Sequence, residues 1–280
     1  MKMKFVVSTL LCTAGFISTI GWGMEPVFAF LGNSTVQEPL TSVSFSRGGD
    51  MLGSHHAMSV KAKGDKAWVC YENAAWHNQV PEIEEYLVPV ALLEDIKTIF
   101  NEQKLAKCEK APKSKIFVCD GATSSYRFCF SKRCMHFSTT QDLPDGAYAA
   151  LQNISTCVAD ACQKGERLPG LALEKDAQGE LPTKNVLEKG KVTVKVTGYK
   201  GQQLYFAVGN DTEQEQTIPR EAKITELSNP AAVVAERSEK ESIKLDRHTT
   251  HHDTWKLEKR LEAGTYRLDL GSYTTCFVIR

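Results

Sequence analysis

The distribution of the cysteines constrains the fold more than any other feature of this 280-residue chain. Eight of the nine cysteines lie beyond the first thirty residues, and seven of them fall between residues 40 and 165. The eight are Cys70, Cys108, Cys119, Cys129, Cys134, Cys157, Cys162 and Cys276. Exported domains use cysteines as disulfides, so we expect a cross-linked N-terminal domain. Cys276 either bridges to that domain or leaves an odd thiol in each part.

The N-terminal segment favours export of the chain. Residues 1–4 include two lysines, and residues 5–24 are uncharged and largely apolar. This order, followed by short side chains at the expected cleavage site, is typical of a secretory signal peptide. We expect the signal peptide to span residues 1–29. The alternative is an uncleaved membrane anchor, because about 20 apolar residues can span a bilayer. The sequence thus predicts a secreted or periplasmic protein, attached to a membrane only if the leader is retained.

Local spacing narrows the disulfide pairing at one position. Residues 127–130 and 133–136 resemble hairpin strands around a two-residue turn, which places Cys129 opposite Cys134. Cys157 and Cys162 lie five residues apart in a predicted helix, so they should find other partners. Zinc is the competing use of these cysteines, and the lack of any Cys-x-x-Cys pair argues against it.

The composition divides the mature chain into two domains. Residues 166–190 mix glycine and proline with charged residues, which is typical of a linker. Residues 40–165 show groups of strand-like runs followed by a helical pattern, twice over, with helices introduced by Pro89 and by residues 142–145. This order predicts a disulfide-braced α+β domain, in which an antiparallel sheet carries two helices on one face.

Residues 191–280 show the period-two alternation of an all-β domain. Within residues 261–270 a glycine turn leads to Tyr266 at the start of a strand, where its hydroxyl can bond back to the corner. This stretch resembles the late strands of bacterial immunoglobulin-like and pre-peptidase-type C-terminal modules of exported proteins. The resemblance implies an immunoglobulin-like β-sandwich, without an internal disulfide because Cys276 stands alone. Residues 118–128 also resemble a pattern of uncharacterised bacterial secreted domains, which implies no activity.

The overall charge balance and one cluster of aromatic residues indicate the role that we expect for the protein. Lys+Arg and Asp+Glu both number 34, so no basic field favours nucleic acid as a partner. An aromatic-rich patch comprises Trp68, Tyr71, Trp76 and His77. A loop tryptophan offers a large flat contact to a sugar or peptide, although it more often folds back onto the core. We expect these four residues to bind an extracellular glycan or protein ligand, with no cofactor indicated and the oligomeric state open.

An extracellular hydrolase is the alternative function. The strings that begin at Asp120 and Asp269 resemble the aspartic-peptidase motif, although neither has the threonine that should follow the aspartate. Aspartic catalysis requires two carboxyl groups close enough to share a proton. The hypothesis therefore requires Asp120 and Asp269 to meet, within one chain or between two. An aspartate at a β-turn explains both strings equally well.

Metal binding is the second alternative. His248, His251 and His252 precede Asp253, which places three imidazoles and a carboxylate within six residues. Such groups suit a transition metal. In an extended strand His248 and His252 share a face and His251 points away, so only a loop brings the three together. A solvated turn between two strands is the competing interpretation.

Overall fold

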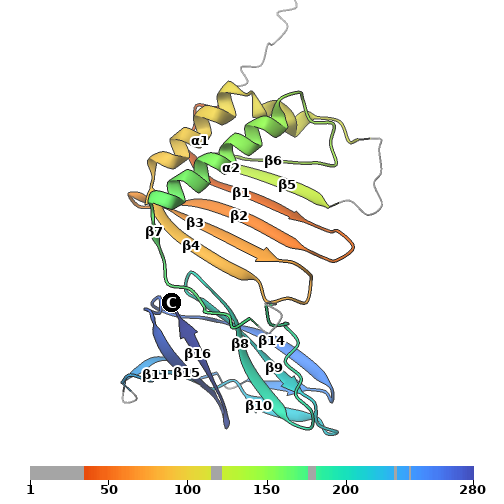
Figure 1. The fold of residues 1–280 in the computed structure, drawn as a ribbon, viewed down its shortest axis with the longest axis vertical. Helices are drawn as coiled ribbons and strands as arrows, with labels where there is room; N and C mark the ends of the chain where they lie inside the picture. The colour runs from red at the N-terminus through yellow and green to blue at the C-terminus, as the bar shows by residue number, and fades with distance from the viewer. Residues whose placement is uncertain (1–34, 115–121, 176–180, 230–231, 240) are drawn as a thin grey trace, which may run out of the picture. The chain divides into compact units, whose positions relative to one another are not determined.

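A seven-stranded antiparallel sheet forms the first half of the fold in the computed structural model (Figure 1). The structure describes residues 35–114, 122–175, 181–229, 232–239 and 241–280, so the predicted leader, Cys119 and Asp120 lie outside it. The strands are β1 (Leu40–Gly48), β2 (His55–Lys63), β3 (Lys66–Ala74), β4 (Glu82–Pro89), β5 (Thr123–Phe130), β6 (Cys134–Ser138) and β7 (Glu166–Arg167). Their order in the sheet is β6-β5-β1-β2-β3-β4-β7.

Two helices, α1 (Ala91–Glu102) and α2 (Ala147–Lys164), lie side by side across this sheet (Figure 1). A short 3₁₀ helix, η1 (Leu105–Lys110), follows α1. The apolar periodicity of α1 buries Leu92, Leu93, Ile96 and Phe100, as the sequence predicts. In α2, Leu151, Ile154 and Val158 are buried as expected. Tyr148, in the first turn of the same helix, is 57% exposed.

The core under the helices is built from paired strand residues. Val43 of β1 lies opposite Val60 of β2 and Phe128 of β5, and Val60 lies opposite Val69 of β3. All four are buried against the helices. Successive strand residues alternate between faces, so every second residue of these strands points toward α1 and α2. This alternation decides which side chains can take part in a site on the helix side.

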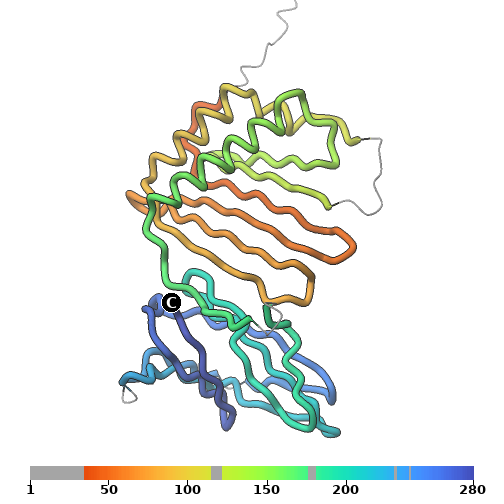
Figure 2. The backbone as a smooth tube through the Cα atoms, viewed as in Figure 1, coloured from red at the N-terminus to blue at the C-terminus, as the bar shows by residue number. Residues whose placement is uncertain are grey.

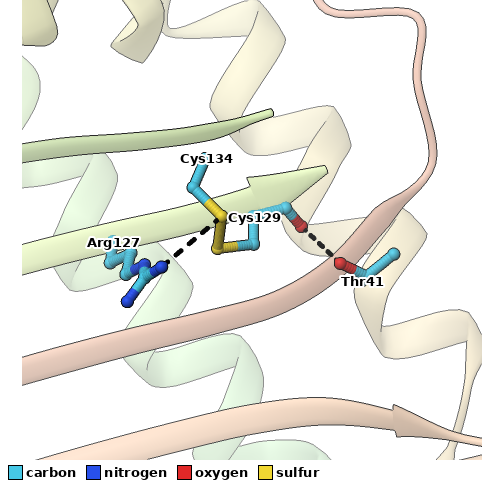
Figure 3. The surroundings of a disulfide bond; sticks show 4 residues. All are labelled: Thr41, Arg127, Cys129 and Cys134. Atoms are coloured by element: carbon cyan, nitrogen blue, oxygen red, sulfur yellow. Dashed lines mark hydrogen bonds between the residues drawn. A yellow bond between two sulfur atoms is a disulfide. The ribbon is translucent and has the colours of Figure 1, made fainter. Parts of the chain in front are cut away.

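The predicted cross-strand disulfide between Cys129 and Cys134 is confirmed (Figure 3). The two residues are direct partners in the β5–β6 hairpin, with Cα atoms 4.0 Å apart. Thr41 donates a hydrogen bond from Oγ1 to the Cys129 carbonyl at 2.9 Å, which ties the hairpin to β1. The disulfide and this hydrogen bond together hold the end of β5 against β6 and β1.

The expectation that the other cysteines are bridged requires correction. Five of them are free thiols in the structure: Cys70, Cys108, Cys157, Cys162 and Cys276. Cys157 and Cys162 lie on α2, Cys70 on β3 and Cys276 on β16, so no second pair is brought together among the described residues. Buried free cysteines act as small apolar residues, and Cys70, Cys108 and Cys162 are buried.

Replacing both Cys129 and Cys134 with serine should lower the free energy of unfolding by about 2 kcal/mol, because the bridge closes only a short loop. Urea denaturation under oxidising conditions measures the change. Replacement of the exposed free Cys276 with serine is the control and should shift stability by less than about 0.5 kcal/mol. Equal losses in the two variants would contradict the bridge.

The second half of the fold consists of antiparallel β-structure. Its strands are β8 (Val192–Lys200), β9 (Gln203–Asn210), β10 (Gln216–Pro219), β11 (Ala222–Glu226), β12 (Val233–Arg237), β13 (Ser242–Leu245), β14 (Thr249–Lys256), β15 (Gly264–Leu270) and β16 (Tyr273–Ile279). They form sheets in the orders β12-β11-β15-β16, β14-β9-β8 and β10-β13. A second hydrophobic core fills this half and includes Phe206, Ile224 and Leu268. As expected, the Tyr266 hydroxyl donates back to the Glu262 carbonyl at 3.0 Å.

The segment predicted as a linker is held by backbone hydrogen bonds. Leu168 donates to the Glu85 carbonyl, and Gly170 exchanges two hydrogen bonds with Arg280. Farther along, Lys184 donates to the Asn78 carbonyl. Main-chain pairing requires no apolar periodicity, so a sequence pattern could not reveal it.

Within the described residues the fold is β-rich and antiparallel with few helices, as predicted in outline. None of its described helices has the length and apolar character needed to span a membrane.

Candidate functional site

A groove of about 1010 Å³ lies between helix α2 and the adjoining face of the seven-stranded sheet. We call it the sheet groove. It is lined by residues of β1 to β5, of β7 and of α2, so most of the sheet contributes to it. Pockets of this size that combine aromatic and polar side chains are the default hypothesis for a binding site.

The floor of the groove is a row of paired residues that crosses five strands. The row is Tyr126, Phe45, Met58, Tyr71 and Glu84, from β5, β1, β2, β3 and β4. Phe45, Tyr71 and Tyr126 are only half-buried, whereas the neighbouring row with Val43 and Phe128 is fully covered. Phe45 and Tyr126 pack edge to face with ring centroids 5.0 Å apart. The floor therefore offers firmly packed aromatic surface to a ligand.

The rim of the groove is the next row outward, and it is polar. Ser124, Arg47, His56 and Asn73 follow one another across β5, β1, β2 and β3. His56 Nδ1 lies 3.1 Å from Asn73 Oδ1. Arg47 is exposed, and among the described residues its guanidinium makes no ion pair. Burial raises the pKa of Tyr126, and the charge of Arg47 acts in the opposite direction.

One face of α2 forms the wall of the groove. The wall residues are Tyr148, Leu151, Gln152, Ser155, Ala159, Cys162 and Gln163. They recur at intervals of three and four residues, as expected for one helical face. A rise of 1.5 Å per residue from Tyr148 to Gln163 makes the wall about 22 Å long. None of these seven side chains is Asp, Glu, Lys, Arg or His, so the wall adds hydrogen bonding and no charge.

The far end of the groove is electrically neutral. Arg167 Nη2 lies 2.6 Å from Glu84 Oε1, and the Tyr86 hydroxyl donates to Glu84 Oε2 at 3.3 Å. Burial raises the pKa of Cys162, although a hydrogen bond from Tyr71 favours the thiolate. The thiol is thus protonated at neutral pH and is a poor nucleophile. The groove is equipped for recognition, with its unneutralised charge at Arg47 in the rim.

The structure separates the four residues expected to bind a ligand. Tyr71 lies in the floor of the sheet groove. Trp68 lies on the opposite face of β3, where its Nε1 donates to Glu85 Oε1 at 2.7 Å. Trp76 and His77 lie in the β3–β4 loop, with the Trp76 ring half-buried and its Nε1 lacking a partner among the described groups. Only Tyr71 lines the groove.

Sequence reasoning missed Phe45, Arg47, His56 and Tyr126. A signal for them exists in β1, where Val43, Phe45 and Arg47 point to one face and change from apolar to aromatic to charged. When the residues on the core-facing side of a strand change from apolar to charged along the strand, the charged end lies where the helices no longer cover the sheet. Recognising the groove also required the pairing of β1 with β5, which the sequence pattern does not provide.

The carboxylate pair of the hydrolase alternative cannot be measured in the structure, because Asp120 lies outside the described residues. Its expected partner, Asp269, lies on β15. It accepts hydrogen bonds from Thr274 Oγ1 at 2.8 Å and Arg267 Nε at 3.1 Å. The Asp269 carboxylate is thus already held by its neighbours.

The three histidines of the metal alternative do not converge. His251 and His252 are consecutive in β14 and so point to opposite faces. His248 precedes the strand, and its Nδ1 lies 2.9 Å from Asp211 Oδ1. A hydrogen bond with Asp211 raises the pKa of His248, and burial lowers the pKa of His252. Among the described residues, no three His, Cys, Asp or Glu side chains are grouped to hold a metal ion.

A buried carboxylate on the other face of the sheet explains the position of Trp68. Glu85 accepts hydrogen bonds from Trp68 Nε1, from the Gly201 N–H and from Arg260 Nη2, at 2.7, 2.9 and 2.7 Å. Nearby, burial raises the pKa of Cys70 to about 12. The Glu85 carboxylate is held by three donors, and the Arg260 Nη groups also donate to the Gly201 and Pro169 carbonyls, so we assign the cluster a structural role.

Comparison of the whole sequence with protein-family models and with curated proteins finds no match. The functional argument therefore rests on the geometry of the site. Within that geometry, the sheet groove combines half-buried aromatic rings with an unpaired cation.

Proposed function

We propose that this protein is an exported binding protein that holds a glycan or a protein segment in the sheet groove. The observation that carries the proposal is the half-buried aromatic floor next to the unpaired Arg47. Aromatic surface left open on an otherwise covered sheet face is typical of a recognition site, because rigid rings give a large contact area at a low entropic cost. The polar rim and wall would then orient the ligand.

The proposed location and architecture have separate support. Export agrees with the basic and apolar leader and with the Cys129–Cys134 bridge, since disulfides persist outside the cytoplasm. For residues 191–280 we propose an immunoglobulin-like sandwich, which is supported by the antiparallel sheets and by the hydrogen bond of Tyr266 to the preceding corner. That module would present the groove-bearing domain and would not itself bind the ligand.

Filling the groove should abolish ligand retention. We expect Ala159→Trp, on the exposed wall of α2, to weaken any groove-dependent ligand at least tenfold, or about 1.4 kcal/mol, because the indole occupies the ligand's space. The full chain would be screened on glycan and peptide arrays, and the ligands retained would be titrated by calorimetry.

The same helix offers a matched control. Ala149 is also an exposed alanine of α2 but does not line the groove, so Ala149→Trp should leave both affinity and melting temperature nearly unchanged. If every ligand that the wild type retains tolerates Ala159→Trp as well as Ala149→Trp, the groove is not the binding site and the proposal fails.

A further inference from the structure

Two apolar side chains project from the β1–β2 hairpin, and the groove does not account for them. Met51 and Leu52 are 82% and 69% exposed. The hairpin that carries them reaches beyond the β3–β4 turn (Figure 2). Two adjacent aliphatic side chains held in water at a loop tip offer apolar surface to another macromolecule.

The tip is held in a defined conformation. Asp50 Oδ1 accepts a hydrogen bond from the Ser54 N–H at 2.8 Å, and Gly53 N–H donates to the Asp50 carbonyl at 2.9 Å. The His77 N–H donates to the Leu52 carbonyl at 3.3 Å, which braces the tip from the β3–β4 loop. Met51 and Leu52 are therefore presented by a supported turn, at little further entropic cost to binding.

The tip and the rim of the sheet groove form one continuous surface. The last paired residues of the hairpin, Gly48 and His55, directly follow the rim pair Arg47 and His56. A ligand that leaves the groove past Arg47 thus meets the tip next. Because Glu84 is paired with Arg167, the unpaired charge among the groove-lining side chains is the positive charge of Arg47, and the Asp50 carboxylate of the tip is held by hydrogen bonds from Ser54.

We infer that the occupant of the sheet groove is an extended segment of another protein, with an acidic residue at Arg47 and an adjacent apolar residue on the Met51–Leu52 tip. This inference rests on the proposed binding function and specifies its ligand. A wall of about 22 Å matches about seven residues of extended chain at 3.3 Å each. A sugar stacks on aromatic rings, and the aliphatic tip offers it none, whereas an apolar side chain of a peptide fits that tip.

Selection from a displayed library of random dodecapeptides on the full chain tests the inference. We expect the enriched peptides to carry Asp or Glu next to an apolar residue, and the corresponding synthetic peptides to bind more weakly as salt is raised. Arg47→Glu should weaken them at least tenfold, and Arg47→Gln should weaken them less. The double variant Met51→Ser, Leu52→Ser should weaken them about fivefold.

Lys61→Glu provides the matched control. Lys61 is exposed on β2 but points to the opposite face of the sheet, so its reversal changes net charge equally and should alter affinity less than twofold. Near-ultraviolet circular dichroism checks that each variant is folded. Because Arg47, Met51 and Leu52 are exposed, their replacement should leave the spectrum unchanged.

The outcomes separate this inference from the proposed function. If glycans bind in a manner that Ala159→Trp abolishes, and no selected peptide does, the inference is overturned while the binding function stands. The inference also fails if the selected peptides are basic, or if they bind Arg47→Glu as well as Lys61→Glu. If no glycan and no peptide responds to Ala159→Trp, both proposals fail.

Discussion

Replacing Glu85 with alanine should lower the free energy of unfolding by about 3–5 kcal/mol. The carboxylate is 2% exposed, and it accepts hydrogen bonds from Trp68, Gly201 and Arg260. Alanine would remove the acceptor of the Trp68 indole N–H and leave the Arg260 guanidinium with the Gly201 and Pro169 carbonyls but no carboxylate, and donors left unmatched carry the full cost of desolvation. Urea denaturation followed by tryptophan fluorescence measures the loss.

Glu84 is the control from the same strand. It also pairs with an arginine, at 2.6 Å, but its side chain and that of Arg167 are 37% and 65% exposed. Water screens such a pair, so Glu84→Ala should cost less than about 1 kcal/mol. A loss for Glu85→Ala no larger than that for Glu84→Ala would show that the Glu85 cluster does not stabilise the fold.

Glu85 also shows why the predicted binding patch is divided in the structure. Trp68 and Tyr71 are close in the sequence, yet they point to opposite faces of β3, one toward Glu85 and one toward the groove. Strand alternation alone separates them, and applying it to residues 66–74 would have removed Trp68 from the patch. The acceptor for the indole is less accessible to sequence reasoning, because Glu85 reads as an ordinary charged residue until burial is known.

Features set by neighbours in the chain were predictable. The Cys129–Cys134 bridge follows from a two-residue turn, and the two helices follow from apolar periodicity. The groove instead depends on strands that are distant in the sequence. Tyr126 joins Phe45 only because β5 pairs with β1, and no local pattern encodes this register.

The cysteines gave a misleading signal for a related reason. Their number indicates disulfides only if partners meet, and partner distances depend on the tertiary fold. Cys162 illustrates the alternative use of the residue, because it is a buried free thiol in the wall of the groove. There it fills space beside the aromatic floor and does not form a bridge.

The second large effect is expected at Asp253, where replacement with alanine should cost about 3–5 kcal/mol. Asp253 accepts hydrogen bonds from Arg220 Nη2 at 2.9 Å and from Arg237 Nη2 at 3.2 Å, and its side chain and that of Arg237 are 8% and 7% exposed. Arg237 also lies over the rings of Phe206 and Trp255. Loss of the carboxylate would leave this guanidinium in the core with Glu239, 3.8 Å away, as its one charged partner among the described residues.

The same carboxylate should make stability depend on pH in acid. Burial by itself raises the pKa of Asp253, but the Thr254 N–H and the two arginines outweigh it and hold the pKa below its ordinary value. A carboxyl group with a lowered folded-state pKa stabilises the protein above its unfolded pKa, and this contribution disappears as the pH falls through the folded value. The difference in stability between the wild type and Asp253→Ala should therefore be constant near neutral pH and shrink below about pH 4.

Urea denaturation of both proteins at a series of pH values between about 2 and 7 would show this convergence. Asp269→Ala is the control, because Asp269 also pairs with an arginine, Arg267, but in a partly exposed position. It should cost less than about 1 kcal/mol, and its difference from the wild type should be small at every pH. If the loss of stability in Asp253→Ala stays constant down to the lowest pH, the Asp253 side chain stabilises the core by its packing and not by its charge. The two arginines would then be held by their remaining partners, which include Glu239 for both and, for Arg237, the rings of Phe206 and Trp255.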